Sequence, residues 1–182
     1  DLILERTSMD HMYGELASIL ENNVDIIICE TMSHSLEAKS ALNSIQNSTS
    51  QKWLAWTIYG NQNTLPSGET ITEAFGEISD LECDAYLINC GGANLITEGI
   101  KELKLLTNKP IGGYGNSEII EISKKDRSDR PEEDHWSSAT AINEKEYAQE
   151  AQIWVEEGAT IIAGCCRTRP SHIAEISKTL KN

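Results

Sequence analysis

Residues 158–173 read GATIIAGCCRTRPSHI. The stretch begins with Gly158, a typical helix stop, and continues into a short apolar run at 160–165 that is rich in β-branched residues. Such a run predicts a buried strand. Cys165 and Cys166 end this strand, turn-forming residues follow them, and a further helix is expected at about 171–180. The stretch therefore predicts a strand between two helices, with adjacent thiols at the strand's carboxyl end.

The same unit recurs toward the N-terminus. Four more apolar runs predict buried strands, at 24–30, 53–59, 84–90 and 110–114. Helices are expected between them: at about 9–22 and 35–46, over 71–81 after a Thr70 cap, over 95–106, and over 147–155 after an Asn143/Glu146 capping pair. This alternation predicts a parallel sheet with helices on both of its faces.

Two architectures fit the alternation. A five-stranded doubly wound sheet and a piece of an eight-stranded β/α barrel repeat the same right-handed unit, and periodicity alone favours the open sheet. The segment 115–142 breaks the rhythm, because it is polar, charged and far longer than a usual connection. We expect it to be either a functional lid or disordered.

Composition narrows the class of protein. The 182 residues carry 29 acidic and 15 basic side chains, a formal charge of −14 that repels phosphate backbones and anionic lipids. Neither nucleic acid nor membrane is an expected partner. No run reaches the roughly 20 apolar residues of a membrane span, and the N-terminus lacks the pattern of a signal peptide. The expected compartment is the cytoplasm, where five irregularly spaced cysteines indicate free thiols or metal ligands.

Three of the cysteines end predicted strands: Cys90 ends 84–90, and Cys165 with Cys166 ends 160–165. Because the carboxyl ends of parallel strands share one edge, where α/β proteins place their sites, the three thiols can meet there. Three protein ligands with one open position are typical of a catalytic zinc site. The alternative is that these cysteines bind no metal and serve only as core residues, because an adjacent pair can arise by chance and buried cysteines are common as small apolar residues.

A resemblance to a known family bears on the choice between the two architectures and on the choice between a metal site and core cysteines. Residues 158–173 are similar to the signature of the homocysteine S-methyltransferase family, Gly-Cys-Cys-x-Thr followed by Pro-x-His-Ile after the last barrel strand. Three more segments agree in order. Residues 25–41, DIIICETMSHSLEAKSA, resemble the fourth strand with its Glu-Thr pair; 84–94, DAYLINCGGAN, the sixth with its Asn-Cys; and 110–117, PIGGYGNS, the seventh with its Tyr-x-Asn turn.

The resemblance implies a (β/α)8 TIM barrel of which strands 4 to 8 are present, so that residues 1–182 form the C-terminal part of the barrel domain. It implies Zn²⁺ as the cofactor, and Glu30 as the group associated with the amino group of the substrate. Asn89 and Asn116 are further candidates, for a contact around the zinc site and a pocket contact; either can instead serve a turn. The zinc ligands are expected to be Cys90, Cys165 and Cys166.

The implied reaction is methyl transfer from a sulfonium donor, S-methylmethionine or S-adenosylmethionine, to homocysteine, forming methionine. A thiol with a pKa near 8.5 is mostly protonated at neutral pH, whereas the nucleophile is the thiolate. Zinc removes the proton by direct coordination. The sequence therefore predicts an enzyme in which the metal activates the acceptor thiol.

One family motif has no match in this sequence: the Asp-Gly-Gly-x-Gly-Thr loop that helps to hold the substrate carboxylate. Residue 1 corresponds to a point just ahead of the third helix, so we expect a fragment of a longer protein; the alternative is a chain that needs a partner to complete the sheet. The isolated chain is expected not to methylate homocysteine. The alternative function is an inactive zinc-binding remnant or interaction subunit.

Overall fold

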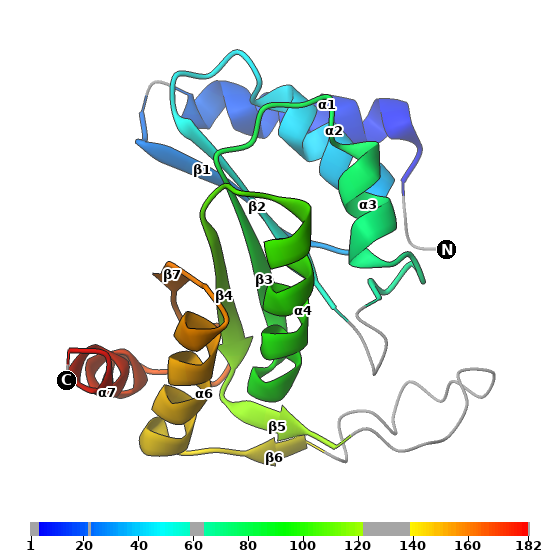
Figure 1. Cartoon of the computed structure of the whole chain (residues 1–182). Coiled ribbons are helices and arrows are strands. Elements are labelled where there is room, and N and C mark those ends of the chain that lie inside the picture. The colour runs from blue at the N-terminus through cyan, green and yellow to red at the C-terminus, as the bar shows by residue number, and fades with distance from the viewer. Residues whose placement is uncertain (1–3, 22, 59–63, 122–138, 182) are drawn as a thin grey trace.

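Five parallel strands form the central sheet of the computed structural model, which describes residues 4–21, 23–58, 64–121 and 139–181 (Figure 1). The strands are β1 (Ile26–Met32), β2 (Gln51–Thr57), β3 (Ala85–Gly92), β4 (Ile111–Asn116) and β7 (Ile161–Ile162). The helices are α1 (Arg6–Leu20), α2 (Ser35–Ser44), α3 (Ile71–Glu77), α4 (Ala93–Leu106), α6 (Glu144–Glu156) and α7 (Pro170–Thr179).

The strands lie in sequence order, β1-β2-β3-β4-β7, and every pair is parallel. A doubly wound sheet would reverse direction at a switch point, so this order excludes it and matches consecutive strands of a barrel. Each predicted strand is present. The last is short, but its backbone pairing continues, because Ala163 N–H donates to Gly113 O (3.2 Å) and Cys165 N–H to Gly115 O (2.9 Å).

The prediction that helices cover both faces of the sheet is wrong for the described residues. The main core joins one side of the strands, including Leu54 and Trp56, to residues of α1, α2, α3, α4, α6 and α7. The opposite side forms a small cluster around Ala55, Leu87 and Tyr114, to which no described helix contributes. The reason is the strand order, since successive right-handed crossovers in one direction place every helix on the same side, as in a barrel.

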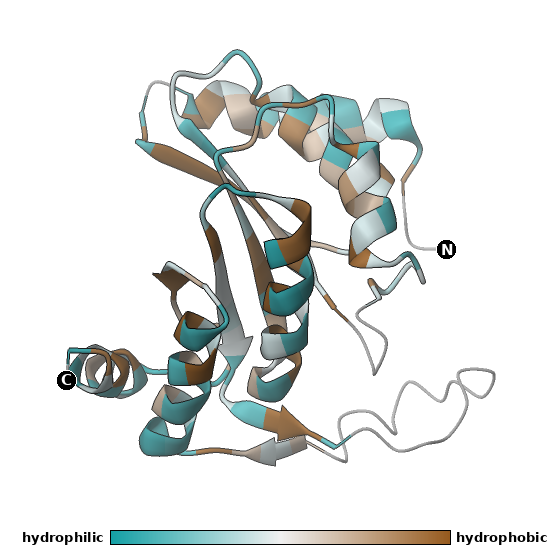
Figure 2. Cartoon of the chain, in the orientation of Figure 1, coloured by the Kyte–Doolittle hydropathy of each residue, from teal (hydrophilic) through white to brown (hydrophobic). Residues whose placement is uncertain are grey.

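The helix-free face is partly open. Ile26 and Ile28 of β1 are 41% and 37% exposed, although both are large apolar side chains. Figure 2 shows β1 as a hydrophobic strand at one edge of the sheet. In a closed barrel this face would be the filled interior.

The predicted signals mark the starts of α3 and α6 and the end of α6, whereas α3 ends at Glu77, four residues before the predicted end at 81. Thr70 and Glu73 form a capping box at the start of α3, and Asn143 and Glu146 form another at the start of α6. Gly158 lies just beyond the end of α6 with φ +111°, a conformation that side chains with a Cβ rarely adopt. These local signals determine where α3 and α6 begin and where α6 ends, and therefore where the chain can start the next strand.

Two short antiparallel strands, β5 (Glu118–Ile120) and β6 (Ala139–Ala141), lie within the segment predicted to be a lid or disordered. Residues 122–138 of that segment lie outside the described residues. The Asn94 side chain anchors β5, because its amide both accepts from Ile120 N–H and donates to Ile120 O, each at 3.0 Å. Of the described helices, none has the length and apolar character to cross a membrane.

Candidate metal centre

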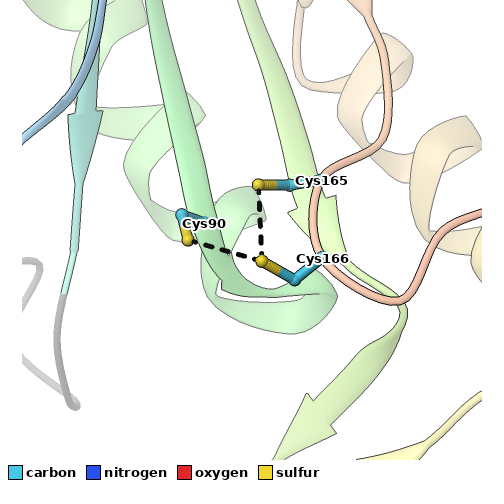
Figure 3. Close-up of side chains that lie close together, drawn as sticks. All are labelled: Cys90, Cys165 and Cys166. Atoms are coloured by element: carbon cyan, nitrogen blue, oxygen red, sulfur yellow. Dashed lines mark hydrogen bonds between the residues drawn. The ribbon is translucent and has the colours of Figure 1, made fainter.

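The three predicted thiols come together at the carboxyl edge of the sheet (Figure 3). Cys166 Sγ lies 4.0 Å from Cys90 Sγ and 4.0 Å from Cys165 Sγ, and all three sulfurs lie within 4.8 Å of one another. A tetrahedral zinc ion with Zn–S distances of about 2.3 Å keeps its sulfur ligands roughly 3.8 Å apart. The donor set and its spacing therefore fit a zinc ion.

A bulge in β3 turns Cys90 toward the other two thiols. Ile88, two residues earlier, packs in the helix-side core, and regular alternation would send Cys90 the same way. The β3–β4 register instead breaks between Asn89 and Gly92, and Cys90 has φ +57°. Such a conformation costs a non-glycine residue roughly 1–2 kcal/mol, and bulges of this kind gather next to functional sites.

A tight turn explains how adjacent cysteines reach one point. Cys165 still pairs with β4, while Arg167 has φ +63° and reverses the chain. The Thr168 hydroxyl closes the turn by donating to Cys165 O (2.6 Å). Both side chains therefore project to the same side, with Cys166 exposed and Cys165 half-buried.

Burial favours the protonated form of two of the clustered thiols, Cys90 and Cys165, in the absence of a cation. Burial, and then the neighbouring thiols, raise the pKa of Cys90 to about 12, and the same two causes raise the pKa of Cys165. Three thiolates this close repel one another unless a cation lies between them. Metal binding at this site must therefore displace protons, and it would relieve the repulsion.

Glu30 lies at a second bulge on the same edge of the sheet, where Thr31 has φ +61° and the β1–β2 register breaks between Cys29 and Met32. The exposed Glu30 carboxylate accepts a hydrogen bond from Tyr114 Oη (3.3 Å), which reaches it from β4 across the helix-free face. Burial, and then Glu30, raise the pKa of Tyr114, so the phenol remains a neutral donor.

The two asparagines are buried at different points of the edge. Asn89 donates to Thr31 Oγ1 (2.7 Å), beside Glu30, and its Oδ1 has no hydrogen-bond partner among the described residues. Asn116 contacts the backbone at two of the thiols: its Oδ1 accepts from Cys166 N–H (3.1 Å) and its Nδ2 donates to Cys90 O (3.4 Å).

The sequence prediction did not include Tyr114, Thr31, Glu118 or Arg167, although all four lie at this edge. The available signal for Tyr114 was its place as the last residue of the predicted strand 110–114. Thr31 belongs to the Glu-Thr pair of the resemblance, whereas Glu118 and Arg167 have no comparable signal, because their roles depend on ion pairing between distant segments.

Comparison with known proteins gives a consistent result. A family model described as homocysteine S-methyltransferase matches residues 3–180. A selenocysteine methyltransferase of Astragalus bisulcatus is 29% identical over 188 residues, which covers 100% of this chain and 52% of that protein. Homocysteine S-methyltransferase 1 of Brassica oleracea var. italica is 30% identical over 167 residues, covering 90% of this chain and 48% of that protein.

Solved structures agree on the fold. The apo form of the homocysteine methyltransferase MmuM from Escherichia coli aligns with a TM-score of 0.74 at 19% identity, covering 98% of this chain and 58% of that one. Its metallated form aligns with a TM-score of 0.72 at 20% identity, covering 98% and 53%. The chain thus spans about half the length of the relatives it matches.

Proposed function

The chain belongs to the homocysteine S-methyltransferase family, and we propose that it carries the metal-binding half of a site that transfers a methyl group from a sulfonium donor to homocysteine, forming methionine. The observation that carries the proposal is the three-cysteine cluster at the carboxyl edge of five parallel strands. We further propose that these strands are strands 4 to 8 of a (β/α)8 barrel, and the open face around Ile26 and Ile28 supports this.

Cys90, Cys165 and Cys166 would hold the zinc ion. When bound, zinc lowers the pKa of a coordinated thiol and so supplies the thiolate that attacks a methyl group. The exposure of Cys166 leaves the cluster accessible to a substrate thiol. A selenol could be methylated in the same way, and the similarity to a selenocysteine methyltransferase makes it a second candidate acceptor.

Other residues on the edge would position the amino acid. The Glu30 carboxylate would bind the substrate's amino group, and the Tyr114 hydrogen bond would fix the orientation of that carboxylate. The free Oδ1 of the buried Asn89 is an acceptor that a substrate donor could satisfy, because buried polar atoms are costly without a partner. The substrate would then lie between β1 and the three thiols.

The methyl donor is proposed to be S-methylmethionine or S-adenosylmethionine, and the compartment the cytoplasm. Both donors carry a sulfonium cation, which the net charge of −14 would attract to the protein. The alternative function is a zinc-binding remnant or an interaction subunit without activity.

Methionine formation from homocysteine tests these alternatives. The chain is assayed with each donor, alone and joined to a segment that supplies the family's Asp-Gly-Gly-x-Gly-Thr loop. We expect turnover from the joined protein, loss of turnover with a chelator and recovery with added zinc. The chain alone should be inactive, because positioning of the substrate contributes roughly 7–11 kcal/mol to such reactions.

Two results would count against this expectation. Zinc binding without methionine from either preparation would support the inactive remnant instead. Turnover by the chain alone at a rate comparable to the joined protein would show that the described strands already form a complete site.

A further inference from the structure

The turn from β4 into β5 contacts the cysteine-bearing turn at three consecutive residues. The Asn116 side chain accepts from Cys166 N–H (3.1 Å), Ser117 N–H donates to Cys166 O (3.0 Å), and the Glu118 carboxylate pairs with Arg167 Nη1 (2.8 Å). Cys166 is therefore held at its own N–H and C=O groups and through the side chain of the residue that follows it. None of these contacts involves a sulfur atom: two of them bind the backbone of Cys166, and the third binds the Arg167 side chain.

Asn116 also holds the strained backbone at Cys90. The bulge removes this part of β3 from its ladder with β4, and the Cys90 carbonyl accepts from Asn116 Nδ2 (3.4 Å) instead. A single amide thus bridges the two segments that carry Cys90 and Cys166. Asn116 is 2% exposed, which leaves water little access to replace these bonds.

Glu118 determines which way the Asn116 amide faces. Its Oε1 accepts from Asn116 Nδ2 (3.1 Å), so both amide hydrogens and the amide oxygen are engaged. A flipped amide would set its oxygen against the Glu118 carboxylate and its NH₂ group against Cys166 N–H. Glu118 is 1% exposed, and Arg167 balances its buried charge.

We propose that Asn116, oriented by Glu118, sets the separation of Cys90 and Cys166, and that Asn116 and Glu118 are positioning residues of the metal centre. This inference rests on the proposed zinc site but concerns residues that contribute no ligand atom to the three-sulfur cluster. Partners that orient metal ligands from outside typically change metal affinity 10–100-fold when they are removed, so an effect of about that size is expected.

Zinc affinity, measured by competition with a chromophoric chelator, provides the test, with the unfolding midpoint of the metal-free protein as a second readout. Asn116→Ala is expected to weaken zinc binding roughly 10–100-fold. Asn94→Ala is the matched control, because Asn94 makes two backbone hydrogen bonds to β5 yet contacts no cysteine. It should also lower the midpoint, but it should leave zinc affinity within about twofold of the parent, since no ligand segment moves.

Exchanging the amide and the carboxylate between positions 116 and 118 distinguishes an effect on positioning from an effect on packing. Asn116→Asp sets two carboxylates against each other and should weaken zinc binding at least as much as Asn116→Ala. Adding Glu118→Gln restores one donor and one acceptor between the same positions, so the double variant should regain about tenfold over Asn116→Asp alone. It should not reach the parent, because an aspartate side chain cannot donate to the Cys90 carbonyl. A simple loss of packing would not be rescued in this way.

The outcomes are distinguishable. If the parent binds zinc and Asn116→Ala binds it equally well, or the double variant is no better than Asn116→Asp, the positioning inference is wrong and the proposed function stands. If Asn94→Ala weakens zinc binding as much as Asn116→Ala, both substitutions act by loosening β5 in general, and the positioning inference is wrong. If the parent binds no zinc, both the zinc site and this inference are wrong.

Discussion

Substituting serine for Cys90, Cys165 or Cys166 is expected to reduce bound zinc from about one ion per chain to nearly none. Each substitution removes one of the three sulfurs that lie within 4.8 Å of one another, and two remaining thiolates hold the ion far less tightly. Elemental analysis of the purified, reduced variants measures the effect.

The two remaining cysteines provide the control. Cys29 and Cys83 lie in the helix-side core, where burial raises their pKa to about 12 and about 11. Cys29→Ala and Cys83→Ala should therefore retain zinc at the parental level; alanine avoids placing an unpaired hydroxyl in the core. Undiminished zinc in Cys90→Ser or Cys165→Ser would overturn the assignment of the ligands.

Gly112→Ala is expected to have the largest effect on stability, about 3 kcal/mol or more, together with loss of zinc binding. A Cβ at Gly112 would lie 2.2 Å from Ile161 O, a backbone atom of the neighbouring strand that cannot rotate away. The β7 strand would have to separate from β4, and it leads directly to Cys165 and Cys166. Denaturant unfolding and zinc analysis measure the two effects.

Gly14→Ala is the control for this substitution. Gly14 lies inside α1, and a Cβ there meets nothing within 4 Å. Its replacement should stabilise the protein by roughly 0.5–1 kcal/mol, because alanine loses less backbone entropy in a helix than glycine does. An unfolding free energy for Gly112→Ala within about 0.5 kcal/mol of the parent would show that β4 and β7 are not packed as closely as described.

Much of the fold could be predicted because its signals are local. The capping pairs Thr70/Glu73 and Asn143/Glu146 use side chains three residues apart, and the strands are short apolar runs. The meeting of the three thiols also follows from sequence, since Cys90 and the 165–166 pair each end a strand of a parallel sheet. The family resemblance selected the barrel order that periodicity did not.

The rest depends on geometry that no local pattern encodes. Whether helices lie on one face or both is set by the order of the strands, and so the predicted coverage was wrong. The bulges at Thr31 and Cys90 occur at residues without the usual glycine signal for a positive φ. Glu118 lies in a polar segment, and its partner Arg167 follows a different strand.

X-ray absorption at the zinc K-edge of the zinc-loaded, reduced chain is the most direct test of the central claim, that three cysteines hold a zinc ion with one open position. We expect a zinc ion with sulfur neighbours from Cys90, Cys165 and Cys166 at about 2.3 Å and one lighter nitrogen or oxygen neighbour. Two or fewer sulfur neighbours, or a fully sulfur-coordinated ion without added thiol, would contradict it.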